Sequence, residues 1–126
     1  MSKILETLLY TESHEWVKLE GDKAVIGITD HAQDSLGDIV FLNLPEEGDT
    51  VTAGTPFCDV ESVKAVSDIY SPVSGTISAV NDALADAPEL LNEDPYAVWI
   101  CEVQPVTGQE TFLSAAEYEA FLAKEG

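Results

Sequence analysis

Short runs of β-branched and aromatic residues recur along the chain and are separated by turn-forming residues. Runs of this kind, with a turn about every eight to twelve residues, are typical of half-buried strands in a small barrel or sandwich. Strands are expected at residues 10–19, 23–28, 39–44, 50–51, 56–63, 67–70, 76–80 and 98–103. In the last of these, alternation places Trp99, Cys101 and Val103 on one face. The pattern predicts a mainly β fold.

Three other segments predict helices. In residues 29–37, Thr29 or Asp30 can cap a short helix, and Gly37 suits its C-terminal end. Residues 81–96 carry cap signals and two prolines, which indicates one or two short helical turns. The clearest helix is expected at about residues 114–124. There Ser114 and Glu117 form a capping box, and Leu113 can pack on Tyr118 as a hydrophobic staple.

Composition limits the partners that this chain can bind. Its 126 residues, 45% of them hydrophobic, allow one folded domain over 1–126. Twenty-four acidic residues against five lysines and no arginine give a formal net charge of −19. This charge disfavours nucleic acids and anionic membranes, and it favours a monomer that meets its partners through their positive patches. Because the N-terminus lacks a secretory layout, a bacterial cytoplasmic location is expected, or the mitochondrial matrix for a processed chain.

The usual catalytic and metal-binding patterns are missing from the sequence. Cys58 and Cys101 lie in apolar, strand-like runs, so two reduced core thiols are expected. His14 and His31 fall in different predicted elements and show no metal-ligand spacing, and His31 is expected to pack with the first helix. Trp16, Trp99 and Phe41 are interpreted as core or sheet aromatics.

Lys64 is the residue with the most distinctive setting. Apolar strand-like stretches flank it on both sides and are separated by about one turn, so its amine would project from a hairpin tip. A primary amine on a flexible four-carbon stem can carry an acyl group as an amide. Glu61 and Asp68 lie on either side of it and offer a recognition surface for an attaching enzyme. These features alone leave open whether Lys64 is a modified lysine or an ordinary exposed one.

The segment ESVKAVSDIYSPVSG at residues 61–75 resembles the lipoyl-attachment hairpin of the H-protein family of the glycine cleavage system. Further motifs resemble the same family in the same order and together cover about residues 8–104. They are SHEWV at 13–17, GITDHAQ at 27–33, LGDIVF at 36–41, LP at 44–45 and NEDPY at 92–96. The family usually has a glycine-containing loop before the following Trp. Here Ala97 and Val98 stand in its place, which stiffens the turn and would affect docking near that edge.

The resemblance implies a lipoyl-domain-like barrel-sandwich hybrid with a covalent lipoyl-lysine at Lys64 and no catalytic activity of its own. It implies a carrier that takes an aminomethyl group from a pyridoxal-phosphate glycine decarboxylase to a tetrahydrofolate-dependent aminomethyltransferase. A dihydrolipoyl dehydrogenase would reoxidise the dithiol, and a lipoate ligase or lipoyl transferase would attach the cofactor. Glu15 and Asp68 match acidic positions of the family near the arm and would hold the amine, whereas Glu61 would face the lipoylating enzyme.

Other functions are weighed against this one. A biotin carrier usually has methionines beside its lysine, but Val63 and Ala65 occupy those places here. Lipoyl domains of 2-oxoacid dehydrogenases are shorter and form part of larger chains. A stand-alone enzyme is disfavoured because no nucleophile–base motif is found. An H-like relay carrier that donates lipoate to other proteins stays open.

Overall fold

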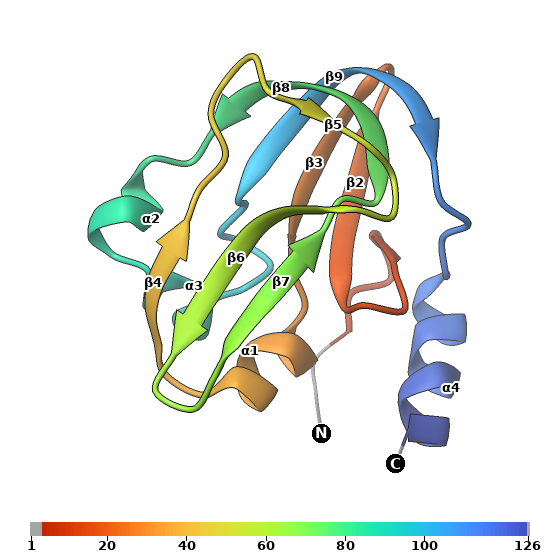
Figure 1. Ribbon diagram of the computed structural model, residues 1–126. Helices are drawn as coiled ribbons and strands as arrows, with labels where there is room; N and C mark the ends of the chain where they lie inside the picture. The colour runs from red at the N-terminus through yellow and green to blue at the C-terminus, as the bar shows by residue number, and fades with distance from the viewer. Residues whose placement is uncertain (1–3, 126) are drawn as a thin grey trace.

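The computed structural model describes residues 4–125, whose strands form two antiparallel sheets that face each other across the core (Figure 1). The larger sheet has the strand order β1-β2-β3-β9-β8-β5, and the smaller has the order β4-β6-β7. The strands are β1 (Leu9–Tyr10), β2 (Glu15–Glu20), β3 (Lys23–Ile28), β4 (Ile39–Asn43), β5 (Thr50–Val51), β6 (Pro56–Ser62), β7 (Val66–Tyr70), β8 (Val73–Val80) and β9 (Cys101–Gln109). The helices are α1 (Asp30–Leu36), α2 (Ala83–Asp86), α3 (Leu90–Glu93) and α4 (Ala115–Glu125). This architecture confirms the mainly β prediction.

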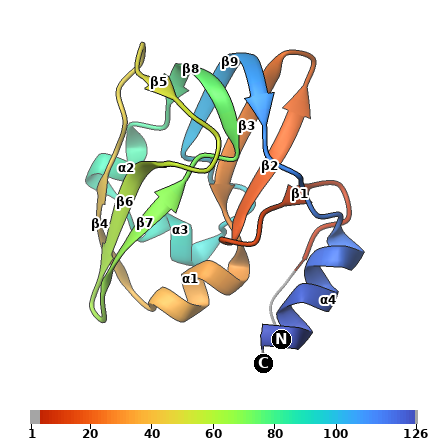
Figure 2. The ribbon, with the colours of Figure 1, turned by 45° about the vertical axis from the view of Figure 1, so that its right-hand side comes forward.

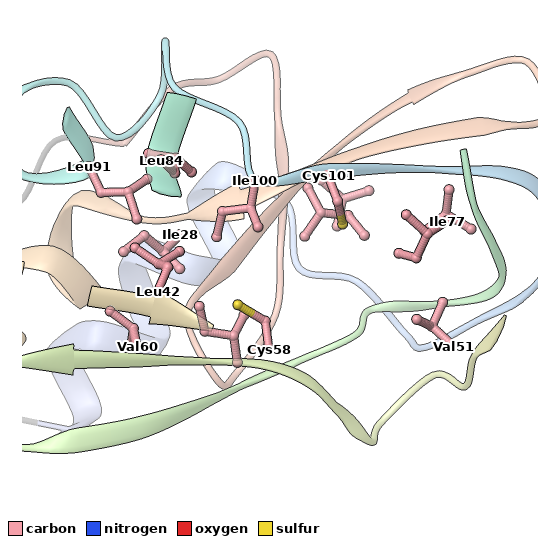
Figure 3. Packing of buried hydrophobic residues seen from close by; sticks show 14 of the residues in the cluster. Ile28, Leu42, Val51, Cys58, Val60, Ile77, Leu84, Leu91, Ile100 and Cys101 are labelled. Atoms are coloured by element: carbon pink, nitrogen blue, oxygen red, sulfur yellow. The ribbon is translucent and has the colours of Figure 1, made fainter. Parts of the chain in front are cut away.

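The main core lies between the two sheets. Ile26, Ile77 and Val103 of the larger sheet and Leu42 and Val60 of the smaller one are all buried in it. Leucines of α2 and α3 close one end, as Figure 3 shows. Burial of this apolar surface is the main force that holds the sheets together.

Three predicted strands differ from the structure by more than one residue, and one of them, expected at 76–80, begins already at Val73. The expected strand at 10–19 is interrupted, because His14 donates its N–H to the Thr11 carbonyl (3.1 Å) and forms a turn between β1 and β2. The expected strand at 98–103 begins only at Cys101 and continues to Gln109. Trp99 therefore does not share a face with Cys101, and it packs in a second apolar cluster instead.

The two best-defined helix predictions are confirmed down to their caps. The Thr29 hydroxyl accepts the backbone N–H of Ala32 at 3.2 Å, and Gly37, with φ 74°, ends α1. Before α4, the Ser114 hydroxyl accepts the N–H of Glu117 at 3.2 Å, and the Glu117 carboxylate accepts the N–H of Ser114 at 2.8 Å. The two short helical turns expected within residues 81–96 are α2 and α3.

The second cluster joins the two ends of the described chain. Tyr118 of α4 is fully buried and stacks on Tyr10, with ring centroids 4.6 Å apart and planes 4° apart. Backbone hydrogen bonds of 2.9 and 2.7 Å link Tyr10 with Leu113, which packs in the same cluster as Tyr118. Figure 2 shows α4 standing beside β1, away from the smaller sheet. Leu113 and Tyr118, the residues of the predicted hydrophobic staple, therefore belong to a larger apolar cluster that also contains Tyr10.

Close packing at Gly27 generates a stability prediction. Gly27 pairs with Trp16 across β2 and β3, and a Cβ on Gly27 would lie 2.5 Å from the Trp16 indole. Gly27→Ala is therefore expected to lower the free energy of unfolding by about 1–3 kcal/mol, as overpacking of a core does. Urea denaturation followed by fluorescence measures this change.

Gly108→Ala is the matched control. A Cβ there would lie 3.6 Å from Ser74, which is an ordinary contact, so its effect is expected to stay below about 1 kcal/mol. Equal destabilisation by the two variants would contradict the steric account.

Candidate functional site

The turn between β6 and β7 carries Lys64 on a firmly bonded backbone. Ser62 donates its N–H to the Ala65 carbonyl at 2.8 Å, and its hydroxyl accepts the N–H groups of Lys64 and Ala65 at 3.2 Å each. Val63 donates its N–H to the carbonyl of Asp38 at 3.0 Å, in the segment that joins α1 to β4. In Figure 1 the green hairpin tip lies next to this orange segment. The lysine side chain therefore leaves the backbone from a defined place.

Lys64 itself is exposed, as a modifiable lysine must be. Among residues 4–125, the lysines that form ion pairs are Lys18 and Lys23, and no carboxylate pairs with Lys64. The aliphatic part of its side chain lies close to Gly37, because a Cβ on Gly37 would be 3.3 Å from Cε of Lys64. The amine is thus accessible to an acylating enzyme, and its stem lies at the C-terminal end of α1.

A cavity of about 300 Å³ opens between α1, the start of β2, and β7. Glu15 and Asp68, both expected near the arm, line it together. Leu36 also lines it and directly precedes Gly37, against which the Lys64 stem lies. The structure therefore brings two of the predicted carboxylates to one cavity, whose α1 wall ends beside Lys64.

Glu15 is a buried carboxylate, only 2% exposed. The hydroxyls of Thr11 and Ser13 each donate a hydrogen bond of 2.6 Å to it, and the Tyr70 N–H lies 3.4 Å from its second oxygen. Burial raises the pKa of Glu15 above its ordinary value, and the nearby Glu110 carboxylate adds to this effect, whereas the three hydrogen bonds partly oppose it. A cation placed beside this carboxylate would stabilise its charged form.

His14 is a cavity residue that sequence reasoning did not assign to the site. Its backbone has φ 73°, which is uncommon for a residue with a side chain. Its Nδ1 lies 2.8 Å from the hydroxyl of Tyr118, which also lies 2.8 Å from the hydroxyl of Thr29. The His14 ring contacts that of His31, with centroids 4.5 Å apart, and both histidines line the cavity. The C-terminal helix therefore supports this wall, which no local sequence signal indicated.

Glu61 lies apart from the cavity. In the smaller sheet it pairs with Phe41 on one side and with Val66 on the other, close to the Lys64 turn. Phe41, interpreted from the sequence as a core or sheet aromatic, lies in β4 but is 48% exposed. Glu61 thus stands beside exposed apolar side chains near the tip, separate from Glu15 and Asp68.

The remaining candidate groups are structural. Cys58 and Cys101 are free thiols in the core between the sheets, and burial raises the pKa of Cys58 to about 12. Among residues 4–125, no group of three or more His, Cys, Asp or Glu side chains is arranged to hold a metal ion. Within the same part of the chain, no helix has both the length and the apolar character needed to cross a bilayer.

Residues 8–125 match the family model described as "Glycine cleavage H-protein". The chain belongs to the glycine cleavage H-protein family. A glycine cleavage system H protein of Lachnoclostridium phytofermentans is 52% identical over 124 residues, covering 98% of each chain. One from Nitratidesulfovibrio vulgaris is 56% identical over 119 residues, covering 94% of each.

A solved structure gives the same result for the fold. The crystal structure of a glycine cleavage system H protein from Mycobacterium marinum matches with a TM-score of 0.90 and 42% identity. The match covers 95% of this chain and 99% of that one. The barrel-sandwich hybrid implied by the H-protein resemblance is thereby confirmed.

The raised pKa of Glu15 predicts a pH-dependent effect of its removal. Because the pKa of Glu15 is raised from its ordinary value of 4.5, the folded protein binds the Glu15 proton more tightly than the unfolded chain does. The stability contributed by this proton is lost as the pH rises through the raised pKa. The free energy of unfolding of Glu15→Gln, minus that of the wild type, is therefore expected to increase with pH above 4.5.

Urea unfolding of both proteins between about pH 4 and about pH 8 measures this difference. Glu12→Gln, on an exposed neighbour in the preceding turn, controls for the loss of one negative charge from an acidic chain. A difference for Glu15→Gln that stays constant over this range would contradict the prediction.

Proposed function

We propose that Lys64 is the attachment point through which this H protein serves as the lipoyl carrier of the glycine cleavage system. The observation that carries the assignment to this lysine is its exposed side chain, which pairs with no carboxylate among residues 4–125, on a turn that is hydrogen-bonded on both sides. Proteins of this family carry lipoate covalently and work with the other components of the system. The attached dithiolane supplies a sulfur that carries an aminomethyl group and a dithiol that can be reoxidised.

The residues near Lys64 fit an acyl-lysine arm. Gly37 leaves room for the lysine stem, because a side chain there would crowd it. The adjoining cavity of about 300 Å³ has room for a slender group of several atoms. Glu15 and Asp68 would hold a primary ammonium group in it by charge-assisted hydrogen bonds. Such binding would keep the carried amine away from bulk water between partners.

We infer that the protein acts as a single non-catalytic domain, without a reactive nucleophile of its own. Its partners would be a pyridoxal-phosphate glycine decarboxylase, a tetrahydrofolate-dependent aminomethyltransferase, a dihydrolipoyl dehydrogenase and a lipoate ligase or lipoyl transferase. The net charge of −19 favours a monomer that docks briefly on positive surfaces of these enzymes. Glu61, beside the turn, would face the lipoylating enzyme. The relatives reported above are bacterial proteins, which supports a cytoplasmic location.

The lysine assignment is tested by intact-mass analysis and peptide mapping of native protein. A lipoyl adduct on Lys64 is expected. Lys64→Arg is expected to keep the fold, to lose the adduct, and to abolish glycine-dependent exchange of carbon dioxide in the reconstituted system. Arginine keeps the positive charge but cannot form the amide.

Lys18→Arg, at an exposed lysine in β2, is the matched control and should keep both the adduct and the exchange. Biotin at Lys64 would refute the assignment. So would an unmodified Lys64 when lipoate and its ligase are plentiful, or unchanged exchange in Lys64→Arg.

The role of the cavity carboxylates is tested on the unmodified protein with methylammonium as the probe. The cation is expected to shift the amide resonances of Ser13 and Glu15 in an NMR titration. Asp68→Asn should weaken this binding about two- to tenfold, because one charge-assisted contact is lost.

Asp59→Asn is the control, since Asp59 pairs with Asp68 across β6 and β7 but does not line the cavity. Equal weakening by both variants would indicate a general charge effect and would contradict a role for Asp68.

A further inference from the structure

Asn92 of α3 makes three hydrogen bonds to the segment that ends α1. Its Nδ2 donates to the carbonyl of Gly37 at 2.8 Å and to the side-chain oxygen of Gln33 at 3.0 Å. Its Oδ1 accepts the N–H of Ile39 at 2.8 Å. The side-chain amide thus uses both donor hydrogens and an acceptor position. Two of these bonds hold residues 37 and 39 on the same side of the backbone.

On its opposite side, the segment at residues 37–39 is hydrogen-bonded to the Lys64 turn. Between Gly37 and Ile39, the carbonyl of Asp38 accepts the N–H of Val63 at 3.0 Å. The Gly37 carbonyl and the Ile39 N–H therefore bond Asn92 on one side, and the Asp38 carbonyl between them bonds the hairpin on the other, as in a short piece of extended strand. The Lys64 stem lies over Gly37 in the same segment.

No other common side chain of this size can make the same set of bonds. An aspartate at position 92 could still accept from Ile39, but it would turn a second oxygen toward the carbonyl of Gly37. Gly37 is itself constrained, because its φ of 74° and the nearby lysine stem both disfavour a side chain. Asn92 thus bonds the same short segment as the Lys64 turn, from almost thirty residues away in the sequence.

We propose that Asn92 is a positioning residue for Lys64: by holding residues 37–39, it sets where the hairpin presents its amine. This inference rests on the proposed function, because it concerns the lysine assigned to lipoate. It goes further by naming a residue outside the hairpin and the cavity that controls how well Lys64 is recognised for modification.

The test compares Asn92→Ala with Asn81→Ala in the unmodified protein. Asn81 also uses its Nδ2, in a 2.8 Å bond to the carbonyl of Trp99, so its loss removes a similar interaction away from the hairpin. In Asn92→Ala, the Val63 N–H is expected to exchange with solvent about tenfold faster relative to Ile77, a buried residue of β8. Asn81→Ala should leave that ratio within about twofold of the wild type.

Lipoylation of the same proteins by lipoate ligase gives the functional measure. For Asn92→Ala, kcat/KM is expected to fall about tenfold, whereas Asn81→Ala should stay within about twofold. If Asn92→Ala does not fold, Asn92→Asp replaces it, since this variant keeps the side-chain size and the acceptor for Ile39. It should show the same direction of change in both measurements.

Unchanged exchange at Val63 in a folded Asn92 variant would overturn the proposal, as would a wild-type rate of lipoylation. The lipoyl-carrier function of Lys64 and the positioning role of Asn92 can fail separately. If the exchange changes as expected but wild-type Lys64 accepts no lipoyl group, the assigned function fails and the positioning of the turn by Asn92 stands.

Discussion

The hydrogen bond from Val63 to the carbonyl of Asp38 joins the hairpin that carries Lys64 to the segment that follows α1. A two-stranded hairpin fluctuates when it projects alone into water, and its tip is its least constrained part. This bond ties the tip to the end of α1, and α1 also forms one wall of the cavity. The turn that carries the exposed lysine is therefore bonded to the segment that follows the α1 wall of the cavity.

Glu15 adds an electrostatic constraint to this geometry. Among the described residues, its hydrogen bonds come from the neutral donors of Thr11, Ser13 and Tyr70. A buried carboxylate supported only by neutral donors is less favourable than one beside a cation, and Glu110 makes it less favourable still. A positively charged group bound in the cavity would lower this cost.

Much of the fold could be predicted from local signals. Thr29 with Gly37 and Ser114 with Glu117 act within a few residues of one another, so their caps could be recognised in the sequence. The break between β1 and β2 could not be predicted in this way. The turn at Thr11–His14 lacks glycine and proline and is completed by contacts with distant residues.

The site shows the same division between local and distant signals. The flanking strands draw attention to Lys64, and the family resemblance indicates Lys64, Glu15 and Asp68. His14 and Asn92 were not assigned roles there, because their partners lie on α4 and at the end of α1, far away in the sequence. A hydrogen bond between such distant residues leaves no periodicity or spacing for sequence reasoning to detect.

The contact between Tyr118 and His14 also bears on the order in which the molecule can mature. Synthesis proceeds from the N-terminus, so the Lys64 hairpin leaves the ribosome well before α4 does. The wall that His14 contributes can gain its Tyr118 support only after nearly the whole chain has been released. A nascent or truncated chain that lacks α4 would therefore lack the contact that supports this wall of the cavity.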